Sequence, residues 1–292
     1  MTLREQVPPP ELSSRIGGAA SEYDTIGAGH AAAIRSLLPR DWGWAGRRIL
    51  DFGCGTGRTL VHLEADARDA ELWGCDIDAP SIQWAQQNLS PPLNFVVNDE
   101  LPPIHLPSAS FDLAYGMSVF THLVDTWSAW LLEMRRLLKP GGYGIFSFLG
   151  EGMFRALTGR EWDADRVGML GLDVGRPWAI GGPNALHSEW WLREHWGRAF
   201  EIVDVKPYWD ESSRSGHGLV VVRRDERDDP TTEELERIDA TDPREVESLR
   251  LNLELSNERS AALWTDFWAT TTTRSWKAAA RLRRVRDKVL RR

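Results

Sequence analysis

Three glycines at alternate positions follow a short apolar run in the first quarter of the chain. The run ends in Asp51, the glycines are Gly53, Gly55 and Gly57, and an apolar periodic stretch begins at Leu60. Glycine is needed where a strand turns directly into a helix, because a Cβ atom obstructs the required dihedral angles and keeps a ligand away from the main chain. The spacing predicts a strand, a tight turn and a helix that together bind a nucleoside.

The kind of nucleoside is indicated by two further positions. The dinucleotide fingerprint Gly-x-Gly-x-x-Gly needs its third glycine where this chain has Arg58, which disfavours a nicotinamide-dependent oxidoreductase. Asp76 ends a second short apolar run and lies nineteen residues beyond Gly57. A nucleoside-binding unit places at this offset a carboxylate that accepts hydrogen bonds from both ribose hydroxyls.

The form Asp-x-Gly-x-Gly-x-Gly at residues 51–57 resembles the first motif of the class I S-adenosylmethionine-dependent methyltransferases. Residues 110–116, Ser-Phe-Asp-Leu-Ala-Tyr-Gly, are similar to the fourth strand of that family. Residues 135–148, RRLLKPGGYGIFSF, resemble its turn into the fifth strand. The resemblance covers roughly residues 25–224 and implies S-adenosylmethionine as the cofactor.

The resemblance also implies a cofactor site at the carboxyl edge of the sheet. It gives the ribose hydroxyls to Asp76 and the adenine amino group to Asp99, for which a solvated turn is the alternative role. Tyr23 either covers the cofactor or is an ordinary packing residue. The expected cofactor-binding residues are Asp51, Gly53, Cys54, Gly55, Gly57, Asp76, Ile77, Asn98, Asp99, Gly116 and Met117.

Methyl transfer from a sulfonium requires the donor carbon and the acceptor to be held in line and dry. The motif Asn-Pro-Pro-Tyr is absent after the fourth strand, which favours a hydroxyl acceptor over an exocyclic base nitrogen. A hydroxyl acceptor benefits from a base, and the candidates are His122 and His187, with His217 a weaker third. We prefer His187 because it follows a variable segment, although helix capping or packing explains it equally well. No Asp/Asn cluster suited to magnesium is evident, so no metal is expected.

Short links between strand and helix patterns predict an α/β fold. The expected architecture is a Rossmann-like, doubly wound, seven-stranded sheet of the class I methyltransferase type, with a helical C-terminal appendage. The last two strands, near residues 200–205 and 218–223, should form a closing antiparallel pair. The expected division is a flexible N-terminal segment 1–27, a methyltransferase domain 28–224 with a lid insertion 150–186, an acidic linker 225–245 and C-terminal helices 246–292.

The composition is that of a soluble globular protein, with 42% hydrophobic residues and a net charge of −8. The negative charge disfavours binding to nucleic acid. Two cysteines, no signal peptide and no apolar span of bilayer length point to the cytoplasm. The fifteen tryptophans are either core residues or an aromatic platform for sugar rings.

The C-terminal end carries a local positive charge. Residues 274–292 hold nine Lys/Arg against Asp287 alone, with apolar residues at helical spacing, which predicts a basic amphipathic helix. Such a helix suits anionic lipid or an acidic partner, and a solvated tail or a nucleic-acid contact are the alternatives. The segment from Thr273 also resembles the "SrSWrltaPLR" endings of bacterial cell-surface polysaccharide enzymes, although it lacks their proline.

Ahead of this tail, a 3–4 spacing of apolar residues and serines from Val246 to Phe267 predicts a helix that packs on its own domain or on a second copy. The preferred function is O-methylation of a sugar hydroxyl on a cell-surface glycan or glycosylated metabolite. The alternative is a non-catalytic methyltransferase-like partner that recruits a glycosyltransferase or the inner membrane surface through its C-terminal helix.

Overall fold

The computed structural model describes residues 3–13, 20–66, 68–178, 181–209, 214 and 216–272. Seven strands form one sheet in the order β3-β2-β1-β4-β5-β9-β8. The first five strands are parallel, and β9 is antiparallel to both β5 and β8. This arrangement confirms the predicted doubly wound sheet with its closing antiparallel pair. The strands are β1 Arg48–Phe52, β2 Glu71–Asp76, β3 Asn94–Val97, β4 Phe111–Gly116, β5 Leu138–Phe148, β8 Glu201–Lys206 and β9 Gly218–Arg223.

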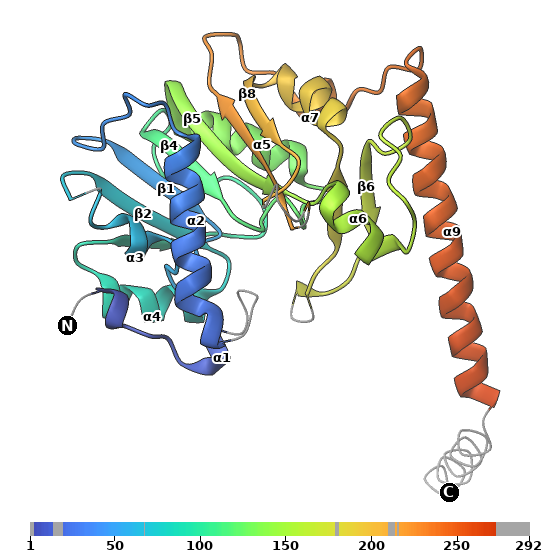
Figure 1. The fold of residues 1–292 in the computed structure, drawn as a ribbon, viewed down its shortest axis with the longest axis horizontal. Helices are drawn as coiled ribbons and strands as arrows, with labels where there is room; N and C mark the ends of the chain where they lie inside the picture. The colour runs from blue at the N-terminus through green and yellow to red at the C-terminus, as the bar shows by residue number, and fades with distance from the viewer. Residues whose placement is uncertain are drawn as a thin grey trace, which may run out of the picture.

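Helices cover both faces of the sheet (Figure 1). One core joins the sheet to α2, α3 and α4, and a second core joins the other face to α5 and α7. The helices are α1 Pro10–Ser13, α2 Tyr23–Leu37, α3 Leu60–Leu63, α4 Ala79–Leu89, α5 Trp127–Leu137, α6 Glu151–Thr158, α7 Glu189–His195, α8 Thr232–Glu236 and α9 Pro243–Thr272; short 3₁₀ turns are Leu3–Glu5, Ala20–Glu22 and Trp196–Arg198. A separate antiparallel pair is formed by β6 Met169–Leu172 and β7 Asn184–His187.

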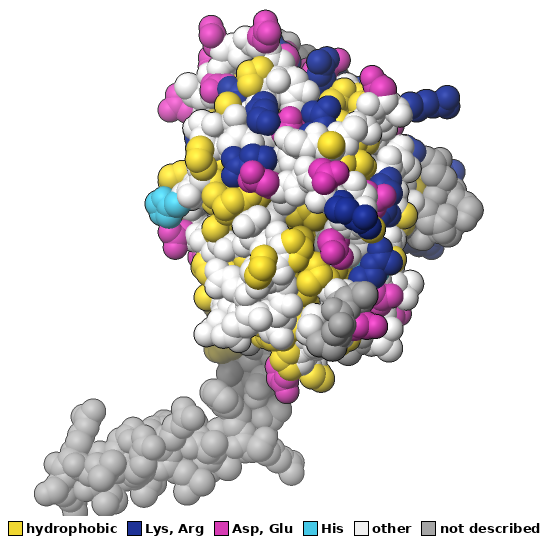
Figure 2. Space-filling model, turned by 90° about the vertical axis from the view of Figure 1, so that its left-hand side faces the viewer, with side chains coloured by type: hydrophobic (Ala, Val, Ile, Leu, Met, Phe, Trp, Pro, Cys, Tyr) yellow, Lys and Arg dark blue, Asp and Glu magenta, His cyan; other side chains and the backbone are white. Residues whose placement is uncertain are grey.

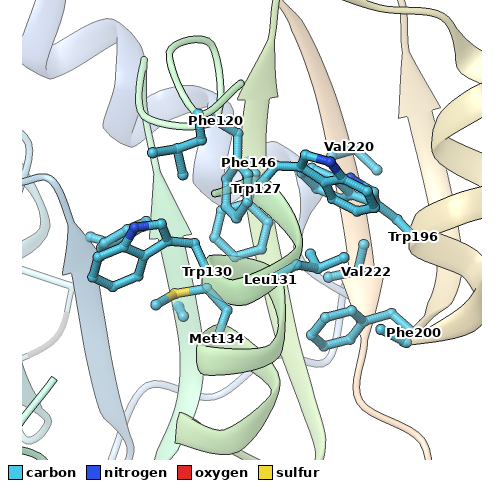
Figure 3. Packing of buried hydrophobic residues seen from close by; sticks show 14 of the residues in the cluster. Phe120, Trp127, Trp130, Leu131, Met134, Phe146, Trp196, Phe200, Val220 and Val222 are labelled. Carbon is cyan, nitrogen blue, oxygen red and sulfur yellow. The ribbon is translucent and has the colours of Figure 1, made fainter. Parts of the chain in front are cut away.

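Aromatic side chains dominate the core between α5, α7 and the sheet (Figure 3). The Phe120 ring lies 5.0 Å from Phe146 and 4.7 Å from Trp196 between ring centroids. Trp130 and Trp196 are both fully buried. Large aromatic rings bury much apolar area at a small cost in side-chain entropy, so this cluster is a principal source of stability. These tryptophans therefore take the core role rather than that of a sugar platform.

Several element boundaries differ from those predicted. The segment expected to be flexible over residues 1–27 is helical from Tyr23, where α2 begins. In the segment that resembles the turn into the fifth strand, β5 already begins at Leu138, because the chain pairs with β4 directly after α5. The lid insertion 150–186 contains regular structure, namely α6, β6 and most of β7. The linker 225–245 contains α8, and a capping box at Thr231 stabilises the first turn of this helix.

The long helix α9 packs on the domain through a face other than the predicted stripe. Leu251 and Leu255 are buried against α6 and β6, and the Ser248 hydroxyl accepts a hydrogen bond from the Gly168 amide at 3.1 Å. The predicted stripe residues Leu249 and Leu253 lie in solvent instead. The 3–4 spacing identifies a helix, but both of its faces carry leucines, and only the domain surface decides which one is buried.

The buried pair His195–Glu245 joins α7 to the start of α9. The His195 Nε2 atom lies 2.8 Å from a Glu245 carboxylate oxygen, and His195 Nδ1 lies 2.7 Å from the Leu235 carbonyl oxygen. Because a carbonyl oxygen only accepts, Nδ1 donates to it.

Within the described ranges, no helix is both long and apolar enough to cross a bilayer.

The two faces of α9 give a stability prediction. Leu255 is 5% exposed and Leu253 is 62% exposed, on the same helix. Leu255→Ala should lower the free energy of unfolding by about 2–4 kcal/mol, because it leaves a cavity under α9. Leu253→Ala should change it by no more than about 0.5 kcal/mol. Urea unfolding followed by circular dichroism measures both, and equal losses would contradict the observed packing of α9.

Candidate functional site

The glycine turn after β1 adopts the backbone that the spacing predicts. Gly53, Gly55 and Gly57 have φ values of +78°, +54° and +80°. The amides of Gly53 and Cys54 donate to the Cys75 carbonyl oxygen at 2.8 and 3.0 Å, which fixes the turn to the end of β2. A Cβ atom at Gly53 would lie 2.3 Å from the Val119 side chain. The turn therefore brings bare main chain to the carboxyl edge of the sheet.

The Asp76 carboxylate lies beside this turn at the end of β2. One of its oxygens accepts from the Gly55 amide at 2.7 Å and the other from the Asp78 amide at 2.8 Å. Burial raises the pKa of Asp76, and the two amide hydrogen bonds oppose that shift. The carboxylate is thus held at the position that the sequence assigned to a ribose-binding acid, with lone pairs remaining for a ligand.

Asp51 is a second buried carboxyl group at the same edge. Burial raises its pKa to about 8, the neighbouring Tyr115 hydroxyl opposes the shift, and the charge of Asp76 adds to it. A buried and a half-buried carboxyl group close together favour a ligand that carries positive charge and disfavour one that carries phosphates.

The end of β3 offers groups suited to a flat heterocycle. The Asn98 side chain is buried, and its Oδ1 atom has no hydrogen-bond partner among the described residues. Its Nδ2 donates to the Asp99 carbonyl oxygen at 2.8 Å, and the Asp99 side chain is exposed. Ile77 exposes 40% of its surface next to Asp76. An exposed aliphatic side chain and a vacant acceptor are what a ring with an amino group requires.

Tyr23 lies against the glycine turn from the N-terminus of α2. Its hydroxyl is 2.7 Å from the Thr56 hydroxyl, and the Arg58 guanidinium lies 5.9 Å from its ring. Burial raises the pKa of Tyr23 to about 12, so its hydroxyl stays protonated. Tyr23 is thus in a position to cover a ligand that binds at this turn.

The residues after β4 carry local strain. Gly116 packs closely enough that a Cβ atom would lie 3.2 Å from the Phe52 carbonyl oxygen, and Met117 is half-buried. Ser118 has φ of +60°, which is uncommon for a residue other than glycine. Its amide donates to the Ser147 hydroxyl at 2.7 Å, and its own hydroxyl lies 3.3 Å from His217 Nδ1. Backbone strain of this kind gathers at functional sites.

His217, which contacts Ser118, interacts electrostatically with two further histidines, His122 and His30. His122 Nδ1 is 2.7 Å from the Pro183 carbonyl oxygen, so Nδ1 donates and the Nε2 lone pair is left for another proton. Burial lowers the pKa of His122. Burial and the charge of His122 lower the pKa of His217 to about 4, and burial, Arg58 and His217 lower that of His30 to about 3. All three rings are therefore neutral at pH 7.

Two tryptophans border these histidines. The Trp209 ring lies 5.1 Å from His30 and the Trp178 ring lies 5.7 Å from His122, both edge to face. Sequence analysis did not single out His30, Trp178 or Trp209. Their segments are separated by many residues, and no local spacing relates them, so only the folded chain brings them together.

His187 does not lie beside these groups, contrary to our preferred assignment. Its side chain is fully buried, and neither ring nitrogen has a hydrogen-bond partner among the described residues. It packs on Trp191 and Trp196 at 5.2 and 6.1 Å, and burial lowers its pKa to about 3. His187 ends β7, where its side chain points into the core, and Ser188 rather than His187 caps α7. A base that contacts substrate cannot occupy this position.

Most of the other residues named from the sequence lie at or just after the carboxyl ends of the parallel strands β1 to β4. The structure brings Asp51, the glycine turn, Asp76, Asn98 and Met117 to one edge, and it places His122 and His217 next to it.

In the described part of the chain, no group of three or more His, Cys, Asp or Glu side chains is arranged to hold a metal ion.

Comparison with known proteins agrees with this geometry. Residues 49–142 match the family described as a methyltransferase domain. The chain is 31% identical over 138 residues to the 27-O-demethylrifamycin SV methyltransferase of Amycolatopsis mediterranei, covering 44% of this chain and 48% of that protein. It is 32% identical over 162 residues to the malonyl-[acyl-carrier protein] O-methyltransferase of Herminiimonas arsenicoxydans, covering 53% and 58%. The chain thus spans about half the length of these relatives.

A solved structure with a similar fold is a chain from the Haloferax volcanii complex that contains the Trm112 methyltransferase activator. It aligns with a TM-score of 0.55 and 17% identity, over 78% of this chain and all of that one. At this identity the likeness concerns the fold alone. The region 49–142 contains the glycine turn, Asp76, Asn98 and Met117, so the sequence match falls on the sheet edge described above.

The close contact at Gly53 gives a prediction with a built-in control. Gly53→Ala places a Cβ atom 2.3 Å from Val119, whereas Gly46→Ala, at a similar φ of +72°, meets nothing within 4 Å. Both variants carry left-handed strain of about 1–2 kcal/mol. Gly53→Ala should lose about 1–3 kcal/mol more from overpacking. Chemical unfolding measures the difference, and similar losses would show that the turn tolerates a side chain.

Proposed function

We propose that this chain is an S-adenosylmethionine-dependent methyltransferase that acts on a hydroxyl group. The observation that carries the proposal is the Asp76 carboxylate at the end of β2, 2.7 Å from the amide of the glycine turn. A carboxylate in this place binds the two ribose hydroxyls of a nucleoside, and the bare turn admits the rest of the molecule. The matched methyltransferase domain covers all of these residues.

The other residues of the edge fit the same cofactor. Ile77 would lie against the adenine ring, and Asn98 with Asp99 would meet its amino group. The turn and Met117 would hold the methionine part, and Asp51 would lie near its positive charge. A dinucleotide fits worse, because its pyrophosphate would face the buried carboxyl groups of Asp51 and Asp76.

His122 and His217 supply the acceptor side of the reaction. S-adenosylmethionine, when bound, supplies a methyl group on a sulfonium. His122 is the proposed base, because its Nδ1–H donates to Pro183 and its Nε2 can accept the proton of the acceptor hydroxyl. His217 would support it through Ser118, whose hydroxyl it contacts. Ser118 and His122 follow β4, and His217 lies between β8 and β9.

The acceptor proposed here is a sugar hydroxyl on a glycan or glycosylated metabolite. Trp178 and Trp209 are partly exposed beside His122 and His30, and an aromatic face packs well on the apolar face of a sugar ring. The relatives named above are methyltransferases of chemically different acceptors, among them an oxygen of rifamycin and a malonyl group. Their names support methylation at an oxygen atom. Because they name different acceptors, the acceptor of this chain is inferred from its own residues.

Residues 150–186 would cover that acceptor. Pro183 accepts the hydrogen bond from His122, and Trp178 packs against the same ring. Water excluded by such a cover would no longer compete with the acceptor hydroxyl.

Isothermal titration with S-adenosylmethionine tests the cofactor assignment. Asp76→Ala removes the ribose acceptor and should raise the Kd at least tenfold, since a hydrogen bond to a charged group contributes about 1.5–3 kcal/mol. Glu71→Ala is the matched control, because it removes an exposed carboxylate from the other end of β2. It should leave the Kd unchanged. Undiminished binding by Asp76→Ala would remove the assignment of that carboxylate.

The pH dependence of turnover tests the base. The pKa of His122 lies below its ordinary value, so the neutral ring that accepts a proton predominates at pH 7 and is lost as the pH falls. The rate with labelled cofactor and an acceptor from a glycan panel should therefore be flat near pH 7 and should fall only at pH values below the ordinary pKa of histidine, about 6.5.

His122→Asn keeps a donor for Pro183 and removes the basic nitrogen. It should lower kcat by about 10²–10⁴-fold, abolish the acidic fall and leave the Kd for S-adenosylmethionine unchanged. His187→Asn, in the core, should reduce stability rather than change the pH profile. If the rate of His122→Asn still falls at acidic pH as in the parent, a group other than His122 causes that fall.

A further inference from the structure

The structure describes α9 as far as Thr272, and the basic helix predicted over residues 274–292 lies outside the described residues. In its described part, α9 lies beside β6 (Figure 1) and closes one edge of that strand with a side chain. The Asn252 Nδ2 atom donates to the Met169 carbonyl oxygen at 2.7 Å, and its Oδ1 atom accepts from the Gly171 amide at 3.2 Å. A strand residue offers the same donor and acceptor to its neighbour. The Asn252 amide therefore takes the place of a neighbouring strand, on the edge of β6 that does not pair with β7.

The strand β6 fits tightly between α9 and the loop after β4. A Cβ atom at Gly168 would lie 2.5 Å from the Ser248 hydroxyl oxygen of α9. A Cβ atom at Gly171 would lie 2.7 Å from the side chain of Val124, which comes two residues after His122. Closely packed groups transmit displacements, because they have no free space to move into. A shift of β6 would therefore reach the loop that carries His122.

The strand β7 contacts the same loop through hydrogen bonds. The Ala185 amide donates to the Thr121 carbonyl oxygen at 2.7 Å, and His122 Nδ1 donates to the carbonyl oxygen of Pro183, the residue before β7. The β6–β7 pair thus connects α9 to His122. A hydrogen bond at Nδ1 decides which ring nitrogen of a neutral histidine keeps its lone pair. The tautomer of His122 therefore depends on the position of this pair.

Ion pairs on both sides of β6 favour one register of α9. Arg160 and Arg166, ahead of β6, reach Glu254 at 3.4 and 3.3 Å, and Arg259 reaches Asp173, directly after β6, at 2.6 Å. On the side opposite α9, which faces the viewer in Figure 2, Lys/Arg and Asp/Glu side chains are interspersed. A general attraction between oppositely charged halves therefore does not place the helix. Half-exposed pairs contribute little to stability, but their order along the helix selects a register.

We propose that Asn252 is a positioning residue for the acceptor side of the site. It holds the outer edge of β6 and, through β7, the Pro183 carbonyl oxygen that orients the His122 ring. The inference rests on the proposed function, in which His122 is the base. It assigns to α9 a part in catalysis that is separate from its contribution to stability.

A purely structural role of Asn252 leads to a different expectation. If Asn252 only held α9 in place, its loss would lower the stability and leave the His122 ring unchanged in the molecules that stay folded. A positioning role changes the ring within the folded protein, because β6 and β7 both contact the loop of His122. The state of the His122 ring therefore distinguishes the two roles.

Nitrogen-15 NMR of the histidine side chains in the full chain tests the proposal without any acceptor. At about pH 8 the His122 ring is neutral and should carry its proton on Nδ1 in the parent. The loss of its signal in His122→Asn assigns it. Asn252→Ala should give a mixture of the two tautomers. Asn257→Ala, which changes an exposed asparagine of the same helix, should keep the parent spectrum. An unchanged His122 signal in Asn252→Ala would overturn the proposal.

A second variant keeps the test decisive if Asn252→Ala does not fold. Asn252→Asp preserves the shape of the side chain and the acceptor for Gly171 but loses the donor to Met169. It should shift the tautomer of His122 in the same direction, and circular dichroism verifies that it is folded. A parent-like tautomer in this variant would count against the proposal in the same way.

Turnover separates this proposal from the proposed function. With labelled S-adenosylmethionine and the glycan panel, Asn252→Ala should lower kcat about 10- to 100-fold, since a misplacement of about 1 Å has effects of this size. The Kd for S-adenosylmethionine should stay unchanged in isothermal titration. A mixed tautomer with an unaltered kcat would contradict the role of His122 as the base, on which the proposal rests. If no acceptor of the panel is methylated, the proposed acceptor class is wrong, and the tautomer still decides whether Asn252 positions the ring.

Discussion

The hydrogen bond from the Gly55 amide to Asp76 is the constraint on which the site depends. It joins the turn after β1 to the end of β2, and the bonds from Gly53 and Cys54 to the Cys75 carbonyl oxygen add to it. Adjacent parallel strands end at one edge, so a short turn that is pinned there presents its main chain at a fixed place. Every other feature of the proposed cofactor site is arranged around this joint.

Electrostatics then separates two halves of the edge. On the cofactor side, burial raises the pKa of Asp51 and Asp76, which leaves carboxyl groups that a cationic ligand would stabilise. On the acceptor side, burial lowers the pKa of His122 and His217, which keeps both rings neutral and able to accept a proton. The same low-polarity surroundings therefore act in opposite directions on acids and bases. This pairing suits the methyl transfer to a hydroxyl that we propose.

The helical appendage shows why periodicity alone leaves a face undecided. Leucines occur on two sides of α9, and the spacing that marks Leu249 and Leu253 also permits Leu251 and Leu255 as the buried pair. The hydrogen bond between Gly168 and Ser248 and the buried His195–Glu245 pair select the second face. The first face is then left to the solvent.

The sequence by itself determined the glycine turn and the place of Asp76, because both depend on residues close together in the chain. The wound sheet and its antiparallel closing pair followed from the strand and helix patterns together with the family resemblance. Tertiary structure alone decided which histidine lies near the edge. His187 and His122 are equally plausible by type, yet one ends a strand that points into the aromatic core and the other follows β4 beside Pro183. Contacts between distant segments set that difference, and local spacing carries no record of them.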